Sequence, residues 1–236
     1  GTASISVTYS DVANNPGTAV TSTTNSSTVV VDTAVPTLGT VSVSSSNANT
    51  SQAKVGDVIT VNIVAGEAIQ TPTVTVAGQA ATVSGTGSTY AATYTVTSNT
   101  PQGTASISVT YSDIANNPGT AVTSTTNSST VVVDTQSPTL YTVDWVPASI
   151  DNANFRNVSF TLSNAELGAT YSYTISSGTS SLTASGTVTN STQVIGNINT
   201  STLRDGIITL SLKIIDQAGN SGLAVTDTIN KATNGG

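Results

Sequence analysis

A segment of 33 residues occurs twice in the chain, and this repeat constrains the fold more than any other feature. Residues 1–33 and 103–135 are identical except at one position, where Val12 is replaced by Ile114. The copies are offset by 102 residues. That spacing is too long for one unit of a solenoid and fits a tandem array of whole domains.

The repeat divides the 236 residues into three parts. We expect residues 1–35 to be the C-terminal hairpin of a preceding module, residues 36–137 to be a complete module, and residues 138–236 to be a diverged module. The motif Pro-Thr-Leu marks the second boundary, because it occurs at Pro36 and again at Pro138. A module of about 100 residues has the length of an Ig-type β-sandwich.

The residue pattern favours β-strands throughout. The β-branched residues Val, Ile and Thr are abundant, and they fit a pleated, half-buried surface better than a helix. Apolar residues alternate clearly, as in Ile59, Val61 and Ile63. We therefore predict an all-β fold of tandem seven-stranded Ig-like β-sandwiches, preceded by a partial module, which is a hairpin of the last two strands.

Seven strands are expected in each full module. The last strand of the complete module is too long to be straight, and a bulge is expected near residues 127–129, where the parity of the apolar residues changes. The expected strands of this module are 39–45, 57–65, 71–77, 79–84, 89–97, 104–111 and 120–134. Those of the diverged module are 141–146, 157–162, 170–176, 181–188, 193–199, 207–215 and 223–230.

Several functions are excluded by what the chain lacks. Without histidine or cysteine, it cannot build a Ser-His-Asp or Cys-His nucleophile or an ordinary zinc site, and we expect no enzyme. With a net charge of -7, it repels the phosphates of nucleic acids. No apolar run approaches the length of a membrane span.

Two motifs resemble those of a known family. Residues 31–36 (VDTAVP) and 133–138 (VDTQSP) resemble the V-D-T-x-x-P joints between bacterial Ig-like modules. Residues 203–206 (LRDG), followed by 215–220 (IDQAGN), resemble the L-x-D-G and D-x-A-G-N motifs of the same modules. The chain is thus similar to the extender region of large secreted adhesins. In the complete module Asn116 stands where this motif has glycine, so we expect a different turn there.

The resemblance implies where the protein is located and what it does. Modules of this type form repetitive proteins on the bacterial cell surface, outside the cell, where they act in adhesion and biofilms. Their partners are the neighbouring modules of the same chain. Calcium often binds at the joints between them.

The acidic residues form two matching sets of three. In an Ig-type sandwich the loop after the second strand, the loop before the last strand and the start of the first strand lie at one pole. Each set takes one residue from each of these places. The first set is Asp32, Glu67 and Asp113, and the second is Asp134, Glu166 and Asp216.

Three neighbouring carboxylates repel one another unless a cation lies between them. Calcium accepts six to eight oxygen ligands in flexible geometry, whereas magnesium demands a stricter octahedron. Backbone carbonyls near Asn116 and Gln217 could complete the shell. We therefore predict a Ca²⁺ site at each joint. The alternative is that each aspartate only forms a local turn, because Asp commonly hydrogen-bonds the backbone two residues on.

The predicted function is a structural stalk whose joints are stiffened by calcium. One alternative is a glycan- or protein-binding module in the third part, with Trp145, Tyr171 and Tyr173 as the contact residues. Exposed, clustered aromatic rings would favour it and buried ones would oppose it. Another is a subunit of a self-assembling surface layer or filament. In that case the hairpin of residues 1–35 would pair with a neighbouring chain.

Overall fold

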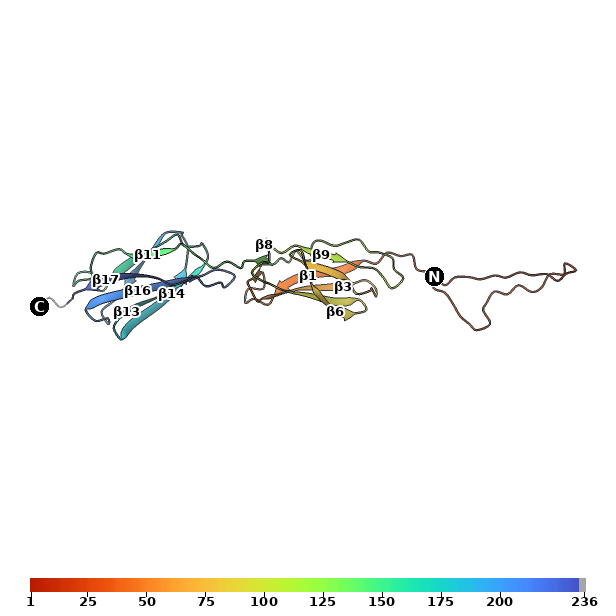
Figure 1. Ribbon diagram of the computed structural model, residues 1–236, viewed down its shortest axis with the longest axis horizontal. Coiled ribbons are helices and arrows are strands. Elements are labelled where there is room, and N and C mark those ends of the chain that lie inside the picture. The colour runs from red at the N-terminus through yellow and green to blue at the C-terminus, as the bar shows by residue number, and fades with distance from the viewer. Residues whose placement is uncertain (234–236) are drawn as a thin grey trace.

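The computed structural model describes residues 1–233 and contains two β-sandwiches and an N-terminal hairpin, arranged end to end (Figure 1). No helix occurs in this range. The predicted all-β fold of Ig-like sandwiches is confirmed. Over the same residues there is no helix of the length and hydropathy needed to cross a membrane. We call residues 1–35 the N-terminal hairpin, residues 36–137 the second module and residues 138–236 the third module.

In the second module two main sheets face each other. The first sheet has the order β1-β3-β7-β6, and the second has the order β5-β4-β9. A third, small sheet has the order β2-β10-β8, in which β10 runs parallel to β2. The strands are β1 (Leu38–Ser45), β2 (Gln52–Ala53), β3 (Val58–Ala65), β4 (Thr73–Val76), β5 (Gln79–Ala80), β6 (Thr82–Thr86), β7 (Thr89–Thr95), β8 (Gly103–Thr104), β9 (Ile107–Thr110) and β10 (Val132–Val133).

Three expected strands of this module differ from the observed ones. The strand expected at 104–111 is divided, because β8 pairs with β10 in the small sheet while β9 pairs with β4. The single strand expected at 79–84 is divided, because β5 pairs with β4 while β6 pairs with β7 in the opposite sheet. The long strand expected at 120–134 is not continuous. It consists of a bridge between Val122 and Val109 and, after a turn, the short β10.

The interruption of the last strand coincides with the expected change of parity. Ser128 adopts a positive φ of 59°, so the chain forms a turn there in place of a bulge. The hydroxyl groups of Thr126 and Ser129 then accept hydrogen bonds from the amides of Val41 and Val43, at 3.1 and 2.9 Å. The turn therefore replaces part of the sheet pairing along the edge of β1.

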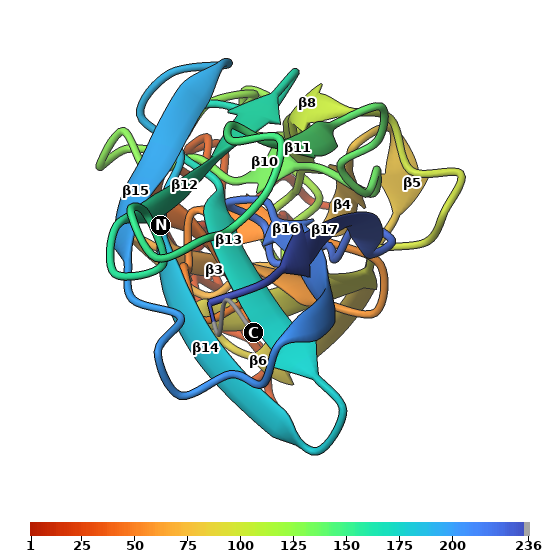
Figure 2. The ribbon, with the colours of Figure 1, turned by 90° about the vertical axis from the view of Figure 1, so that its left-hand side faces the viewer.

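The third module follows the expected strands closely. One sheet has the order β11-β12-β15 and the other has the order β14-β13-β16-β17. Figure 2 looks at this module from the C-terminal end of the molecule. The strands are β11 (Thr142–Trp145), β12 (Val158–Ser163), β13 (Thr170–Ser177), β14 (Ser180–Thr187), β15 (Gln193–Ile198), β16 (Gly206–Ile215) and β17 (Val225–Lys231).

Each sandwich has a core of its own. Along each strand, residues that face inward alternate with residues that face outward, and the inward-facing ones fill the two cores. This is the packing expected for a β-sandwich. The largest fully buried side chains of the second module include Ile59, Ile63 and Ile69. Those of the third module include Phe160, Leu162 and Leu210.

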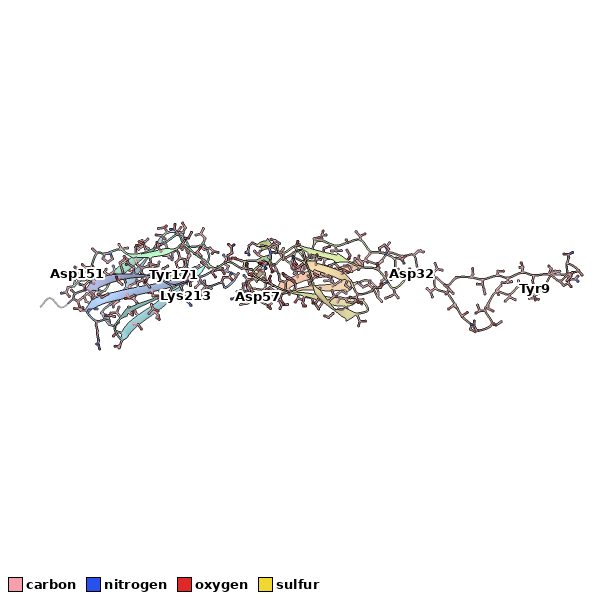
Figure 3. The ribbon with its side chains drawn as sticks, in the orientation of Figure 1. Tyr9, Asp32, Asp57, Asp151, Tyr171 and Lys213 are labelled. Atoms are coloured by element: carbon pink, nitrogen blue, oxygen red, sulfur yellow. The ribbon has the colours of Figure 1, made fainter. Side chains whose placement is uncertain are left out.

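The N-terminal hairpin has no core. It is held by three isolated bridges, which join Thr2 to Val30, Val7 to Val20, and Ser10 to Pro16. Tyr9, marked in Figure 3, is 56% exposed. The apolar side chains of the hairpin are therefore largely in contact with solvent.

Candidate metal sites at the module joints

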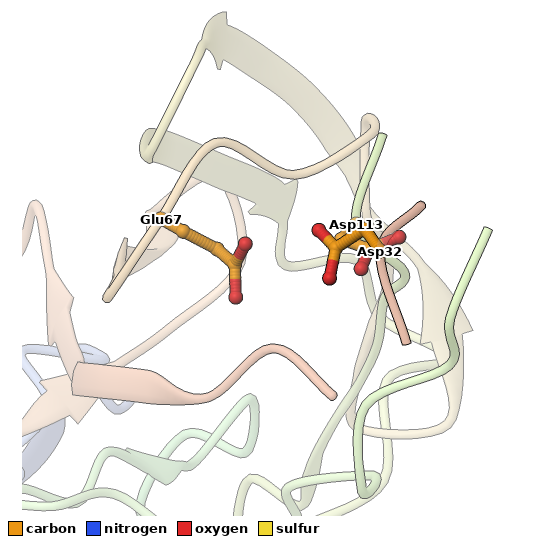
Figure 4. Close-up of side chains that lie close together, drawn as sticks. All are labelled: Asp32, Glu67 and Asp113. Carbon is orange, nitrogen blue, oxygen red and sulfur yellow. The ribbon is translucent and has the colours of Figure 1, made fainter. Parts of the chain in front are cut away.

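Three acidic side chains converge where the N-terminal hairpin meets the second module. Asp32 lies in the linker, Glu67 follows β3, and Asp113 follows β9. Each offers a carboxylate oxygen, and these oxygens all lie within 4.8 Å of one another (Figure 4). Asp113 is buried, whereas Asp32 and Glu67 are exposed. The cluster therefore has one fixed member and two members that solvent reaches.

A tight turn holds Asp113 in place. Its Oδ1 accepts a hydrogen bond of 2.8 Å from the backbone amide of Asn117, and its Oδ2 accepts one of 2.7 Å from the side-chain amide. Asn116 stands at a φ of +71°, and Gly219 at the corresponding place of the third module has +87°. The expected difference between the two turns was wrong, because asparagine adopts the left-handed conformation more readily than other non-glycine residues.

The same turn is tied to the linker and to the loop after β3. The side-chain amide of Asn117 also donates to the carbonyl oxygen of Asp32, at 3.1 Å. Gln70 donates to the carbonyl of Asp113 at 2.9 Å and to the side-chain oxygen of Asn116 at 2.7 Å. The three segments that carry the carboxylates are thus joined by hydrogen bonds.

These hydrogen bonds favour the charged form of Asp113. The pKa of Asp113 lies below its ordinary value, chiefly because the Asn117 side chain donates to the carboxylate, although burial acts in the opposite direction. Within residues 1–233 the one ion pair joins Lys231 to Asp205, so no lysine or arginine neutralises the cluster.

The carboxylate oxygens of the cluster can accept further bonds. The Asp32 Oδ1 accepts only the amide of Ala34, at 3.0 Å, and a carboxylate has about four acceptor sites. The local turn at Asp32, which was the alternative to a metal site, is therefore present. It leaves carboxylate acceptor sites that a further ligand can use. A set of carboxylate oxygens on flexible loops, without nitrogen or sulfur donors, is suited to a hard cation.

The joint between the second and third modules repeats this construction. Asp216 accepts hydrogen bonds of 2.8 Å from the backbone and from the side-chain amide of Asn220. The Asn220 side chain also donates to the carbonyl of Asp134, at 2.9 Å. The linker and the turn before the last strand are therefore joined in the same way at both ends of the second module.

Glu166 completes the second set of carboxylates. Its pKa is raised, first by partial burial and then by the negative charges of Asp216 and Asp134. Glu166 therefore lies close enough to both aspartates for their charges to act on it. The oxygens of the second set are more widely spaced than those of the first set, since the first set alone meets the 4.8 Å spacing among the described residues.

The second joint also contains direct contacts between the two sandwiches. The Lys54 ammonium donates to the carbonyl of Gly219 at 2.8 Å, and the Asn47 side chain donates to that of Ala218 at 2.8 Å. Asp57 holds both donors by accepting from the Asn47 side chain and the Lys54 backbone amide. Asp57 and Asp32 lie at opposite ends of the second module (Figure 3).

Sequence reasoning missed the residues that hold the carboxylates in place. Asn117 and Asn220 could have been found, because each stands four residues after its aspartate within the D-x-A-x-N motif. Lys54 and Asn47 carry no such signal, because their partners are 165 and 171 residues away.

The aromatic residues considered for ligand binding pack against the core of the third module, where Tyr173 is buried and Trp145 and Tyr171 are half-buried. Trp145 is partly buried and lies edge-on against Phe160, with ring centroids 6.2 Å apart. Phe160 in turn contacts Tyr173, which is 8% exposed, at 5.1 Å. Tyr171 stacks on Tyr173 at 6.4 Å. This packing opposes a glycan-binding face made by these rings.

Comparisons with known proteins give matches among solved structures only. No family model matches the chain, and neither does any curated protein. Fibronectin(III)-like modules of CbhA from Clostridium thermocellum match at 11% identity with a TM-score of 0.40, over 84% of this chain and 94% of theirs. A bacterial ice-binding adhesin matches at 18% identity with a TM-score of 0.47, over 84% of this chain and 65% of that one.

A third match is a tetra-tandem repeat in the extending region of a large adhesion protein. It has 18% identity and a TM-score of 0.37, and the match covers 97% of this chain and 56% of that one. The present chain thus spans about two thirds of the ice-binding adhesin chain and just over half of this repeat structure. Two of these three structures are adhesins or adhesion proteins by name, the class of protein that the joint motifs resemble.

Proposed function

We propose that this chain is an extender segment of a bacterial cell-surface adhesin, and that calcium stiffens the joints between its modules. It projects a binding region away from the cell and has no enzymatic activity of its own. The observation that carries the proposal is the convergence of Asp32, Glu67 and Asp113, from three separate segments, within 4.8 Å.

The repeat supports a structural role. A near-identical segment appears twice at an interval of one module, and a catalytic site would not be expected to occur twice in this way. The modules lie end to end (Figure 1), so additional copies increase the length of the rod. The V-D-T-x-x-P joints support a location outside the cell, on the bacterial surface, because they resemble the joints of surface proteins.

The linkers have little freedom even before a cation is considered. Proline fixes φ and restricts the residue before it, and both Pro36 and Pro138 are buried. In the second linker Thr135 receives a hydrogen bond from Gln102 and donates its amide to the same side chain at 3.1 Å. Asp134 is held by Asn220 of the third module. The linker is therefore tied to the modules on both sides.

The carboxylates are the part of the joint that destabilises this restrained arrangement of the linker. In the absence of a cation they repel one another, and the exposed Glu67 and Glu166 lower the repulsion by moving into solvent. A bound calcium ion supplies the positive charge that makes the compact arrangement favourable. The linker, the loop after the second strand and the turn before the last strand then form one unit, which resists bending.

A calcium titration of the chain by isothermal calorimetry tests the proposal. We expect two sites per chain, of which Glu67→Gln removes one and Glu166→Gln removes the other. Asp144→Asn is the matched control, because Asp144 is an exposed carboxylate of β11 outside both clusters. Unchanged stoichiometry in Glu67→Gln would refute the site at the first joint.

A further inference from the structure

The last strand of each module pairs in parallel with a short segment near the start of the same module. In the second module β10, which contains Val133, pairs with β2. In the third module Lys231, at the end of β17, forms a parallel bridge with Ile150. Gly103 lies opposite Val133, and Gly206 lies opposite Lys231. Val133 and Lys231 therefore hold the same place in the two modules.

This parallel pairing decides how a module responds to a pull on its two ends. The chain enters each sandwich at one end of the rod and leaves it at the other (Figure 1). A pull along the rod therefore draws the first segment and the last strand of a module past each other. Bonds that are sheared in this way share the load and break together, whereas bonds that are peeled apart break one at a time. The contacts of the last strand thus set the force that a module withstands.

In the third module a lysine stands where the second module has a core valine. Val133 is 1% exposed and Lys231 is 3% exposed. The Lys231 ammonium donates to the carbonyl of Thr200 at 3.1 Å and to that of Leu203, and it lies 3.7 Å from Oδ1 of Asp205. A buried charge is costly unless it is paired and hydrogen-bonded. These contacts satisfy the charge, and they hold the end of β17 to the loop between β15 and β16.

The residue two positions further along is held in both modules, but by different side chains. In the second module the neutral side chain of Gln102 bonds the amide and the hydroxyl of Thr135. In the third module the carboxylate of Asp205 accepts the amide of Thr233 at 2.9 Å and its hydroxyl at 2.7 Å. Gln102 and Asp205 each precede the glycine that pairs with the last strand. A charged acceptor therefore replaces a neutral side chain at this place.

A third contact joins the first strand to the last one and shows the same change. In the second module the Ser129 hydroxyl accepts the amide of Val43 at 2.9 Å. In the third module Oδ2 of Asp227 accepts the amide of Trp145 at 2.9 Å. Both acceptors stand four residues before the buried position that carries valine in one module and lysine in the other. Hydrogen bonds with a charged partner are roughly twice as strong as neutral ones.

We propose that Asp205, Asp227 and Lys231 form a clamp on the last strand, and that this clamp makes the third module withstand more tension than the second. The proposal rests on the proposed function only in that a stalk carries load. All contacts of the clamp lie within one module and include no carboxylate of the joints. The clamp can therefore be tested without calcium, and its failure is distinguishable from a failure of the calcium sites.

Single-molecule force spectroscopy of the full chain, held by its two ends in the presence of a chelator, tests the proposal. Each sandwich gives one unfolding event, and the third module should give the one at higher force. Lys231→Met should raise the unfolding rate of this event at constant force by about tenfold or more and leave the other event unchanged. Lys213→Met, at an exposed position of β16 outside the clamp, is the matched control and should change neither event. Equal forces in the two variants, or a loss confined to the event at lower force, would overturn the proposal.

Two further variants separate a clamp from a general loss of stability. Ile175→Val removes a methyl group from the core at β13, which pairs with β14 and β16 and not with the first or last strand. Its effect on the unfolding rate should be larger in denaturant than under force, whereas Lys231→Met should show the reverse order. The same order in both variants would contradict a clamp.

Asp227→Asn covers the case in which the lysine variant does not fold. It keeps the size of the side chain and an acceptor oxygen for the Trp145 amide and removes only the charge. The unfolding rate of the event at higher force should rise by about threefold. An unchanged rate would overturn the proposal.

Discussion

The ammonium group of Lys54 lies 2.8 Å from the backbone oxygen of Gly219, in the next module along the chain. The glycine has a φ of +87° and no side chain, so the lysine can approach the turn that carries Asp216. This contact joins the two sandwiches without a cation. It therefore allows the stiffness of the joint to be divided into a part that depends on calcium and a part that does not.

Lys54→Met should loosen the joint in the absence of calcium. The methionine keeps most of the apolar stem but removes the hydrogen bond, which contributes about 1.5–3 kcal/mol when the donor is charged. Residual dipolar couplings of the calcium-free chain should show the alignment of the two sandwiches becoming less correlated. Lys213→Met, in an exposed position of β16, is the control and should change nothing. An equal alignment in both variants would show that the contact does not restrain the joint.

Asn116→Gly should destabilise the second module by no more than about 1 kcal/mol, because glycine also adopts the φ of +71° and only the exposed hydrogen bond from Gln70 is lost. Asn116→Val should destabilise the module by about 1–2 kcal/mol, since a β-branched residue is strained there. Thermal unfolding followed by calorimetry measures both changes. A valine variant as stable as the glycine variant would contradict the assignment of the turn.

Gly119→Ala should destabilise the second module by about 1–3 kcal/mol through overpacking. A Cβ at this position would overlap the ring of Tyr111, which is 8% exposed and cannot move aside. Gly17→Ala creates the same overlap with Tyr9 in the N-terminal hairpin. That ring is 56% exposed and can swing into solvent, so the melting temperature of the sandwiches should not change.

The raised pKa of Glu166 predicts how the calcium-free joint responds to pH. A carboxylate whose folded pKa is raised stabilises the folded state below its ordinary pKa of 4.5, and this contribution is lost as pH rises through the higher folded value. Because the side chain is largely exposed, the effect should be less than about 1 kcal/mol. The stability of the unmodified chain relative to Glu166→Gln should therefore fall as pH rises from 4.5 through the raised pKa of Glu166.

Calcium should reverse this pH dependence, so that the compact joint is favoured at higher pH. The ion requires the charged form of Glu166, so its affinity should fall as pH decreases through the raised pKa of this residue. Calorimetric titrations at a series of pH values measure the change. A site whose affinity is the same in Glu166→Gln and in the unmodified chain would show that Glu166 is not a ligand.

The fold could be predicted from the sequence because it depends on patterns within each strand. The alternation in Ile59, Val61 and Ile63 identified β3, and the strands of the third module were predicted to within a few residues. The division of 79–84 between two sheets could not be predicted in this way. It depends on which sheet edge accepts the hydrogen bonds of β5 and β6, and this is a property of the assembled sandwich.

The same distinction holds for the joints. The sequence predicted that Asp32, Glu67 and Asp113 would come together, because the pole of an Ig-type sandwich gathers the three segments that carry them. It did not predict the wider spacing around Glu166, nor the bonds made by Lys54 and Asn47. Those depend on how two separately folded sandwiches dock, and no local pattern records that arrangement.

Small-angle X-ray scattering of the chain, first with calcium and then with a chelator, tests the central claim most directly. We predict a longer maximum dimension and a narrower distribution of shapes with calcium, and loss of both on chelation. Asp134→Ala should remove the response, while Asp144→Asn should keep it. Scattering curves that are the same with and without calcium would contradict the account.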